Sequence, residues 1–380
     1  MENKLQMLIH GNEPENRNKW ALEWKKEGKK VFGLLDIYVP EEIVSAAGLL
    51  PWRITGTWNE AVPRAATHRP SMTCRFCTHV LESFMNGGLD FVDGMATTQL
   101  DDDVKRLWDV LQYIKKPNYS YIMYLPHVVS TTTLDMWKKS VIEFKETMET
   151  YSGNKINTDE LYRQIKIYNK MRALLRAVYE LRKGKIPALT GAEVLGITTA
   201  ARIMPREIFN ETLESLLPYL KKRKVNNIDG KPRIFMGGEW LDHPGYVKLV
   251  ENCGAIVVMD EFDTGSQYFW DDVDDTVGDP LDALAKRYIM RPGLSRMAQW
   301  EMQVKRNLAW IKEFNANSVV ELRSLYSLPL DYRYLFMRKK YDEAGIPYLS
   351  LDREYHLSQE GMLRTRIEAF LEMMPTHDNK

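Results

Sequence analysis

Apolar and polar residues alternate along the chain in two blocks of similar pattern, separated by a long stretch with helical spacing. In the first block, short apolar runs predict strands near residues 31–35, 49–54, 89–98 and 119–127. Amphipathic stretches between them predict helices over 41–47, 78–88 and 101–114. In the second block, strands are predicted over 231–238, 254–261, 317–324 and 347–352, with helices from about Gly245, near 334–344 and over 362–374. Strands that alternate with helices indicate an α/β fold with open, mostly parallel sheets.

The same pattern predicts how the chain is divided. A polar, Lys/Glu-rich helical arm is expected over residues 1–30, and a first α/β domain over 31–133. Residues 134–228 carry apolar side chains at helical spacing and are expected to form a helical connector. A second α/β domain is expected over 229–380. No nucleotide-binding glycine motif follows the glycine pairs at 87–88 and 237–238, so no ATP site is predicted on this chain.

Composition narrows the possible partners and the compartment. The 380 residues include 52 Lys plus Arg and 52 Asp plus Glu, so the formal net charge is zero. This balance argues against a broad contact with nucleic acid or with an anionic membrane. Three cysteines are too few for a disulfide framework, and the polar N-terminus lacks the apolar core of a signal peptide. We therefore expect a cytoplasmic protein.

Two of the three cysteines, Cys74 and Cys77, form a C-x-x-C motif just before a predicted helix. This spacing occurs in zinc sites, iron–sulfur sites and redox dithiols, and two buried thiols without a function would also fit it. A closed zinc site needs two more ligands, and neither His68 nor His79 follows a zinc-finger spacing. Cys253 begins a predicted strand, the wrong end for a ligand, so we expect it to pack in the core.

Loops after the carboxyl ends of the predicted strands are where an α/β protein of this type binds its ligand. The candidate proton-transfer residues in these loops are His127, Glu239, Asp260 and Asp263. The candidate substrate-binding residues are Arg53, Trp58, Gly237, Gly238 and Ser266. Two acidic runs are interpreted differently: 101–103 is expected to cap the next helix, and 271–275 to form a solvated loop rather than a calcium site.

Several longer segments carry a family resemblance. They are YVPEEIVSAAGLLPWRITG, CRFCTHVLES, LDFVDGMATTQ, YLPH, GAIVVMDEFDTGSQYFW and GIPYLSLDREY followed by GMLRTRIEAFLEMM. From about residue 31 to 374 the chain resembles the 2-hydroxyacyl-CoA dehydratase and benzoyl-CoA reductase family, and looks most similar to a small core subunit of the ATP-dependent (class I) benzoyl-CoA reductases.

That resemblance implies two Rossmann-like α/β domains with helical additions and a homologous partner subunit. It also implies an acyl-CoA thioester substrate and a [4Fe–4S] cluster in the cleft. Low-potential electrons would come from a separate ATP-hydrolysing iron–sulfur activator, so ATP would not bind to this chain. We expect aromatic ring reduction of the benzoyl-CoA reductase type, with dehydration of an (R)-2-hydroxyacyl-CoA as the alternative.

The chain departs from the family pattern at the expected cluster ligands. Members of the family usually hold the cluster with three cysteines. The first position is matched here by the CRFC motif with Cys74 and Cys77. Leu100 stands near the second position, and Tyr326 and Ser327 stand at the third. Either this subunit has lost its own cluster and serves as the partner of a cluster-bearing homologue, or the two thiols hold a cluster with help from another chain or from an oxygen ligand such as Asp101. We favour the first interpretation, because two thiolates are a weak hold for a buried cluster.

Overall fold

A computed structural model describes residues 1–115, 117–276, 278–291 and 296–374. It contains two four-stranded sheets in which all paired strands are parallel. The first sheet has the order β2-β1-β3-β4, built from β1 (Val31–Leu34), β2 (Leu50–Arg53), β3 (Gly94–Thr98) and β4 (Ser120–Met123). The second has the order β6-β5-β7-β8, built from β5 (Arg233–Gly237), β6 (Ile256–Asp260), β7 (Ser318–Ser324) and β8 (Tyr348–Arg353). The predicted α/β architecture is confirmed.

The two sheets repeat one strand order, which the sequence pattern alone could not show. In each, the first strand pairs with the second on one side and the third on the other, for example Val31 with Leu50 and Phe32 with Gly94. Strands β1, β2, β3 and β6 are buried along their whole length, which explains why they read as continuous apolar runs rather than as alternating ones.

Helices flank both sheets at the predicted places, with shifted boundaries. They are α4 (Glu41–Ala46), α5 (Arg75–Met85), α6 (Asp102–Ile114), α11 (Pro244–Asn252), α15 (Leu328–Glu343) and α16 (Glu360–Glu372). The expected cap on α6 is confirmed, because the Asp101 carboxylate accepts a hydrogen bond from the Val104 backbone N–H at 2.7 Å. Strand β3 is shorter than predicted, since residues 89–93 form turns, and β4 ends four residues before His127.

The sequence pattern assigned no element between residues 262 and 316, yet the structure has three helices there. They are α12 (Ser266–Phe269), α13 (Pro280–Met290) and α14 (Trp300–Glu313). Helix α13 packs against the connector helix α7, and α14 packs against α15. Helix α13 buries seven of its eleven residues, arginine and tyrosine among them. Polar residues therefore stand in its buried face, which obscured the helical period in the sequence.

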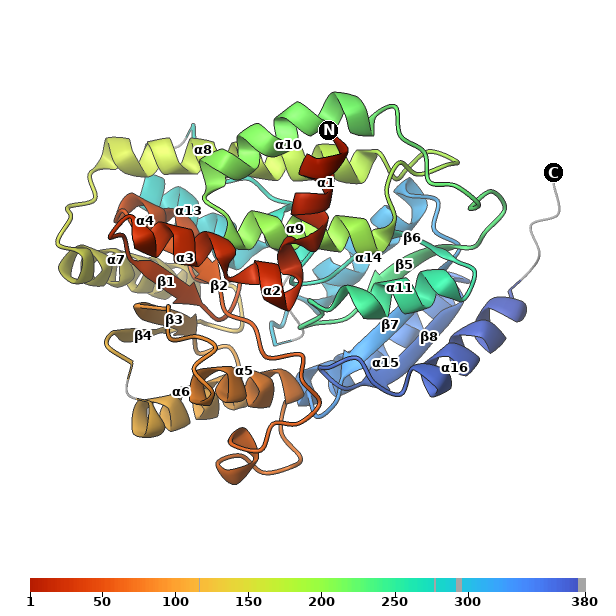
Figure 1. Cartoon of the computed structure of the whole chain (residues 1–380), viewed down its shortest axis with the longest axis horizontal. Helices are drawn as coiled ribbons and strands as arrows, with labels where there is room; N and C mark the ends of the chain where they lie inside the picture. Colours follow the sequence, from red (N-terminus) through yellow and green to blue (C-terminus); the bar gives the residue numbers. More distant parts are fainter. Residues whose placement is uncertain (116, 277, 292–295, 375–380) are drawn as a thin grey trace.

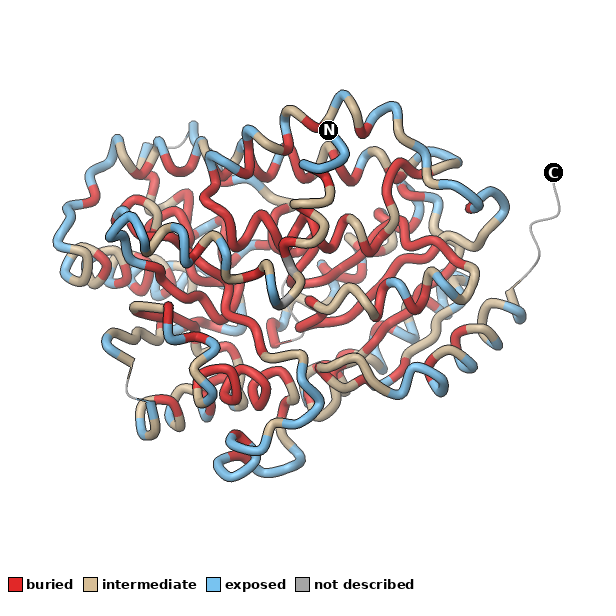
Figure 2. The backbone as a smooth tube through the Cα atoms, viewed as in Figure 1, coloured by how far each residue is buried: buried red, intermediate tan, exposed pale blue. Residues whose placement is uncertain are grey.

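The connector forms a helical layer that lies across the two sheets (Figure 1). Its helices are α7 (Thr131–Ser152), α8 (Thr158–Glu180), α9 (Gly191–Ile203) and α10 (Arg206–Leu220). Helix α9 is buried on nearly all sides and contacts both β2 and β6 (Figure 2). Gly191 allows this close approach, since a Cβ there would lie 2.6 Å from the Val257 Cβ. The connector therefore joins the lobes by direct packing.

The N-terminal residues are helical as predicted, but they do not form a free arm. They fold as α1 (Glu2–Ile9), the 3-10 turn η1 (His10–Asn12), α2 (Pro14–Arg17) and α3 (Lys19–Lys26). Leu5 and Leu8 are fully buried, and α1 crosses α9 at Gly196, where a Cβ would lie 2.3 Å from the Ile9 carbonyl oxygen. Two apolar residues at helical spacing were enough to anchor a segment that is otherwise polar.

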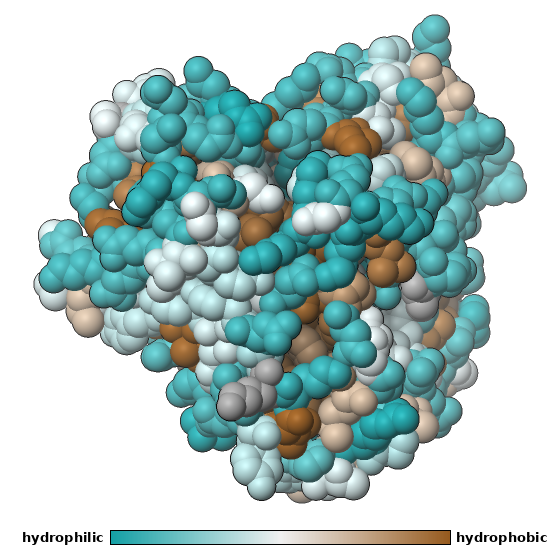
Figure 3. Space-filling view, turned by 60° about the vertical axis from the view of Figure 1, so that its left-hand side comes forward, coloured by the Kyte–Doolittle hydropathy of each residue, from teal (hydrophilic) through white to brown (hydrophobic). Residues whose placement is uncertain are grey.

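The core continues from the first sheet through the connector into the second lobe, with a smaller apolar cluster around α11, β6 and α16. Cys253 ends α11 rather than starting β6, and it packs partly buried against that smaller cluster, as a core residue would. On the face in Figure 3, apolar residues appear as separate spots among hydrophilic ones. Within the described ranges, no helix combines the length and the apolar character that a bilayer span requires.

Candidate functional site

The carboxyl ends of the strands of the two sheets meet between the lobes. In each sheet the middle strands, β1 and β3 or β5 and β7, lie at the point where the connections leave in opposite directions. Ligand sites of open α/β sheets form at this position. Direct contact joins the two sides, because Arg53 at the end of β2 pairs with Asp263, which follows β6, at 3.1 Å.

One buried arginine connects three of these strand ends. The Arg296 side chain donates from Nε to Asp101 Oδ2 at 2.6 Å, and from its terminal nitrogens to Glu239 and, at 3.1 Å, to Ser327 Oγ. Asp101 follows β3, Glu239 follows β5 and Ser327 follows β7. Charge-assisted bonds of a planar guanidinium fix geometry as well as energy. Arg296 therefore holds the first lobe against the second at the switch points of both sheets.

The two thiols of the C-x-x-C motif lie on the first-lobe side of this region and are both buried. Cys74 is the N-cap residue of α5, and its backbone N–H donates to Asp103 Oδ1 at 3.2 Å. Arg69 donates to the same carboxylate oxygen at 2.6 Å. The thiols are hydrogen-bonded to each other, and this bond lowers the pKa of Cys74 while it and burial raise the pKa of Cys77. The pair is thus arranged to share one proton.

Trp240, which follows β5, packs at the centre of these groups. Phe76 of α5 stacks on its ring at 4.0 Å and 8°, and the guanidiniums of Arg53 and Arg296 lie 5.6 and 5.5 Å from the ring centroid. Its backbone N–H donates to Asp263 Oδ1 at 2.7 Å. Both lobes therefore contribute to one buried aromatic and ionic cluster.

Two of the five non-glycine residues with positive φ in the described ranges lie in the same place, and they are the two aromatic ones. Trp240 has φ of 56° and Tyr326 has φ of 60°, a left-handed conformation that bulky residues rarely adopt. Tyr326 lies beneath the Arg75 guanidinium at 4.9 Å. Such conformations cost on the order of 1–3 kcal/mol each and tend to occur at functional sites. Their positions after β5 and β7 add independent support to the site.

The sequence-predicted residues divide between this cluster and other places. Glu239, Asp263 and Arg53 lie in it. Asp260 is buried and accepts hydrogen bonds from the Tyr179 hydroxyl at 2.6 Å and the Ser266 backbone N–H at 2.9 Å. Because Ser266 also donates from Oγ to the Asp260 carbonyl at 2.6 Å, these two residues hold the loop after β6. For none of these candidates is a catalytic or binding role tested, and the roles stay predictions.

His127 and Trp58 are bonded to residues that neighbour the cluster in sequence rather than to its members. His127 is exposed and its Nε2 donates to the Gln99 carbonyl at 3.1 Å. Trp58 donates to Asp242 Oδ1 at 3.3 Å and lies beneath Arg17 at 4.4 Å. His79, near the cysteines in sequence, donates from Nδ1 to the Thr57 carbonyl at 2.7 Å, and burial lowers its pKa to about 4. Within the described ranges no group of three Cys, His, Asp or Glu side chains is arranged to hold a metal ion, so His79 is not placed as a third ligand beside the thiols.

Gly237 and Gly238 have a structural reason for being glycine. Gly238 has φ of +148°, and a Cβ there would lie 2.7 Å from the Leu322 carbonyl oxygen. A Cβ at Gly237 would lie 3.1 Å from Glu261 Oε1. These contacts explain the pair without a ligand, and binding of substrate by it stays a prediction.

Sequence reasoning missed Arg296 and Arg69 and did not single out Trp240. A single arginine in a loop gives no periodic or motif signal, and neither arginine is near its partner in sequence. Arg69 lies 34 residues from Asp103, and Arg296 lies 195 residues from Asp101. Only the folded arrangement brings them together.

The donor groups present do not fit a four-iron cluster held by this chain alone. In the described part of the chain, no group of three or more Cys, His, Asp or Glu side chains is arranged to hold a metal ion. The position near the expected second ligand is the buried side chain of Leu100, and Ser327 at the third is bonded to Arg296. Two thiols that satisfy each other remain, which is fewer than a cluster of this type requires.

Comparison with known proteins agrees with this architecture. The sequence model of the 2-hydroxyglutaryl-CoA dehydratase D-component family matches residues 36–374. The chain belongs to this family. The match begins directly after β1 and ends after α16, so it covers both lobes and the connector.

Relatives in the D-component family cover nearly the full length of the chain. It is 24% identical over 367 residues to the (R)-phenyllactyl-CoA dehydratase beta subunit of Clostridium sporogenes, which covers 95% of this chain and 96% of that protein. It is 26% identical over 368 residues to the beta subunit of (R)-2-hydroxyglutaryl-CoA dehydratase from Acidaminococcus fermentans, covering 93% and 94%. It is 25% identical over 361 residues to one subunit of the benzoyl-CoA reductase of Thauera aromatica, covering 92% of each. These family members are subunits of acyl-CoA dehydratases and reductases.

Proposed function

We propose that this chain is a subunit of an ATP-dependent iron–sulfur acyl-CoA reductase of the benzoyl-CoA reductase type, in which low-potential electrons come from a separate activator. The observation that carries the proposal is the family match over residues 36–374, together with the full-length similarity to a benzoyl-CoA reductase subunit. It is supported by the buried cluster around Arg296 and Trp240, which lies where ligands of open α/β sheets bind. The acyl-CoA thioester would approach this region, with the electron-transferring cofactor carried by the partner chain.

The incomplete ligand set among the described residues gives this chain a specific part in the complex. We infer that it is the partner of a homologous subunit that carries the [4Fe–4S] cluster. Cys74 and Cys77 then keep a structural role at the start of α5, where their mutual hydrogen bond and burial hold them as a closed pair. The Arg296 network maintains the spacing of the lobes that a shared ligand set would otherwise provide.

One exposed face of α15 is suited to such a partner. Leu328, Tyr332, Leu335 and Phe336 recur at helical spacing and are 64%, 71%, 62% and 50% exposed. Trp300 of α14 stacks on Phe336 with ring centroids 5.0 Å apart and widens this surface. The helix starts next to Ser327, so the face adjoins the Arg296 cluster. Clustered exposed apolar side chains of this kind mark protein interfaces.

The central experiment is anaerobic co-expression of the chain with a homologous partner subunit and an activator from the same organism. Iron and acid-labile sulfide are measured on the isolated chain and on the purified complex, and turnover is measured with ATP, a low-potential reductant and benzoyl-CoA. We expect iron near zero on the isolated chain and a cluster in an active complex. Stoichiometric iron and sulfide on the isolated chain would refute the inferred division of roles. A complex that turns over no acyl-CoA would refute the proposed function.

The alternative activity is dehydration of an (R)-2-hydroxyacyl-CoA. The family model and two of the relatives above carry the name of a dehydratase, and this favours it as the second candidate. The same complex is therefore assayed with (R)-2-hydroxyglutaryl-CoA and (R)-phenyllactyl-CoA. Formation of the 2-enoyl-CoA in the absence of ring reduction would replace the first candidate by the second.

The partner surface has its own test. Leu335→Lys places a charge in the middle of the exposed face of α15, and Leu22→Lys makes the same change at a 46% exposed position on α3. We expect Leu335→Lys to reduce the amount of homologue that co-purifies and Leu22→Lys to leave it unchanged, while both variants keep the circular dichroism spectrum of the wild type. Equal recovery of the homologue with both variants would place the interface elsewhere.

A further inference from the structure

A second polar cavity lies beyond the end of β6, outside the cluster described above. It has a volume of about 230 Å³ and lies between the loop after α12 and the helices α13 and α14. Its basic lining residues are Lys286, Arg287, Arg291 and Arg306, and its acidic lining residues are Asp271, Asp272 and Asp274. Four cationic side chains around one small cavity require an explanation, because like charges repel at this range.

The carboxylates in the cavity are already bonded to other groups. Arg306 forms a forked pair with Asp271, at 2.7 and 3.1 Å. Asp272 is paired in the same way with Arg176 of α8, at 2.9 and 2.6 Å. Asp274 accepts from the hydroxyl and backbone N–H of Thr276. Asp271 and Asp272 therefore each have an arginine partner, whereas Asp274 keeps its charge and interacts with Lys286.

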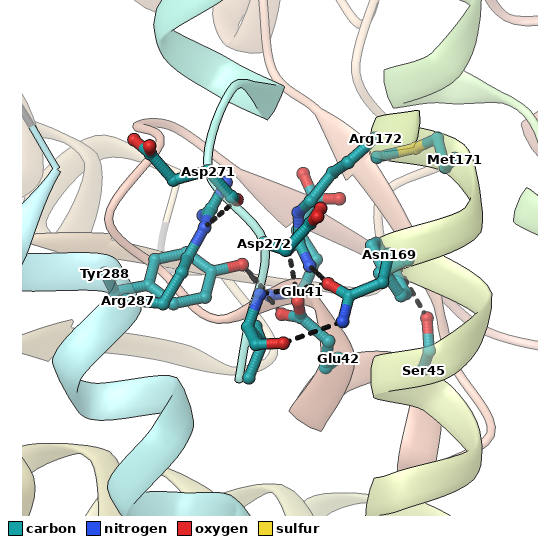
Figure 4. A network of polar contacts seen from close by, with 12 residues as sticks. Glu41, Glu42, Ser45, Asn169, Met171, Arg172, Asp271, Asp272, Arg287 and Tyr288 are labelled. Carbon is teal, nitrogen blue, oxygen red and sulfur yellow. Dashed lines mark hydrogen bonds and ion pairs between the residues drawn. The ribbon is translucent and has the colours of Figure 1, made fainter. Parts of the chain in front are cut away.

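Arg287 and Arg291 donate hydrogen bonds to backbone carbonyls and form no direct ion pair, although carboxylates such as Asp271 lie close enough to interact with their charges. In the described ranges neither forms an ion pair with a carboxylate within 4.0 Å. Arg287 donates to two backbone carbonyls instead, those of Tyr268 at 2.7 Å and Asp271 at 3.1 Å (Figure 4). Burial, with the nearby Arg172 and Arg291, lowers the pKa of Arg287 to about 10, which leaves it protonated at neutral pH.

Arg291 also has unused hydrogen-bond donors. The residue is 3% exposed, and among the described residues its Nε and one terminal nitrogen have no hydrogen-bond partner, while the other terminal nitrogen donates to the Ile37 carbonyl. The guanidinium lies over the Tyr38 ring at 4.5 Å, which fixes its orientation. A buried N–H without a partner is unfavourable by about 1–3 kcal/mol. Because these two nitrogens are closed to solvent, Arg291 would act on an anion in the cavity through its charge.

We propose that this cavity binds a phosphate group of the CoA portion of the acyl-CoA substrate. Arginine side chains in a fork geometry are the usual partners of phosphate oxygens. The cavity is smaller than the roughly 300–1,000 Å³ of pockets that enclose a whole small-molecule ligand, so it suits one charged end of a longer molecule. This inference rests on the proposed function, since it assigns a place to part of that substrate.

The position of the cavity fits a long substrate. Arg291 contacts the loop after β1 through Ile37, and Arg296 of the functional cluster follows five residues later in the sequence. Five residues span at most about 17 Å, so the cavity flanks the cluster. In CoA a flexible pantetheine arm separates the phosphates from the thioester. The phosphates can therefore bind outside the cluster while the thioester reaches it.

The test uses two substitutions at one ion pair that change the cavity charge in opposite directions. Arg306→Gln removes a positive charge and Asp271→Asn removes a negative one, whereas both break the same pair. Arg163→Gln, at a 56% exposed arginine on α8, is the control for loss of a surface charge. Binding of CoA, of 3′-dephospho-CoA and of inorganic pyrophosphate to the full-length chain is measured by calorimetry at constant ionic strength.

We expect the Kd of CoA to rise about tenfold in Arg306→Gln and to fall in Asp271→Asn, with no change in Arg163→Gln. Opposite signs at one ion pair cannot come from general destabilisation. Arg291→Met, checked for folding by circular dichroism, should also weaken binding, because it removes another positive charge from the cavity lining. A weaker affinity for 3′-dephospho-CoA than for CoA would identify the bound group as the 3′-phosphate, and equal affinities would identify the diphosphate.

Equal CoA affinity in the wild type and all four variants would overturn the proposed cavity while leaving acyl-CoA turnover by the complex, and hence the proposed function, intact. If pyrophosphate binding followed the cavity charge and CoA binding did not, the assignment to CoA would be wrong and the site would be one for a free anion. Failure of the complex to turn over any acyl-CoA is a separate result, which counts against the function and is measured without these variants.

Discussion

The buried ion pair between Arg172 and Glu42 allows a quantitative test of how the connector is held to the first lobe. Arg172 of α8 donates to Glu42 Oε1, and the Tyr288 hydroxyl of α13 donates to Glu42 Oε2 at 2.8 Å (Figure 4). The Glu42 side chain is fully buried and that of Arg172 is 2% exposed. Although burial disfavours the charged form, Arg172 and Arg287 hold the pKa of Glu42 below its ordinary value.

Arg172→Met removes the main compensating charge and leaves the Glu42 carboxylate buried with the tyrosine hydroxyl. Loss of one partner from a buried pair costs about 3–5 kcal/mol, because the remaining charge is no longer balanced. We expect the first transition in urea unfolding to lose about this amount at pH 7.5, where Glu42 is ionised in the wild type. The double variant Glu42→Gln/Arg172→Met should recover much of it, since no unpaired charge remains.

The pH dependence gives the sign of the effect. In the wild type the folded pKa of Glu42 is lowered, so its contribution to stability is present above the ordinary pKa and is lost as the pH falls through the folded value. In Arg172→Met burial instead raises the pKa of Glu42, so the cost grows as the pH rises. The difference between the two proteins should therefore be largest at pH 7.5 and shrink toward about pH 5. A loss below about 1 kcal/mol that does not change with pH would refute this account of the ion pair.

Three further predictions concern other parts of the chain. Burial raises the pKa of Glu251 to about 7, although hydrogen bonds from the backbone N–H groups of Gly191, Val257 and Ala192 lower it. Wild-type stability should therefore fall as the pH rises from about 4.5 to 7, by on the order of 3 kcal/mol relative to Glu251→Gln. Parallel pH profiles of the two proteins would contradict this. Gly238→Ala should lower the free energy of unfolding, measured by urea titration, by about 2 kcal/mol or more, because of both its positive φ and a clash with the Leu322 carbonyl oxygen. The control Gly254→Ala has φ of +101° but open space around it, so it should show only the smaller cost of the backbone conformation. The third prediction concerns thiol accessibility, measured with DTNB under anaerobic conditions without reducing agent. DTNB should label the partly buried Cys253 first and reach the buried Cys74 and Cys77 only after denaturation. Fast labelling of all three cysteines in the native chain would show that the motif is open.

Much of the fold was accessible from the sequence because the strands are short apolar runs that are buried on both faces. The runs around β1, β2, β5 to β8 gave strand positions to within a few residues, and the acidic residues before α6 correctly predicted its cap. The prediction failed where buried helices contain charged residues. Helix α13 buries Arg287 and Tyr288 because Glu42 and backbone carbonyls lie opposite them, and those partners come from distant parts of the chain.

The sequence by itself determined the α/β class, the family and the two thiols at the start of α5, since all three depend on local patterns and on ordered motifs. Only the tertiary structure decided which residues surround those thiols. Asp103 is bonded to Cys74, while Arg296, Glu239, Ser327 and Trp240 converge between the lobes, because the two sheets share one strand order and meet at their carboxyl ends. Likewise, the charge of the cavity at Arg291 depends on which carboxylates other arginines already hold. Long-range pairing energies of this kind leave no periodic trace in a single sequence, and so only the fold reveals them.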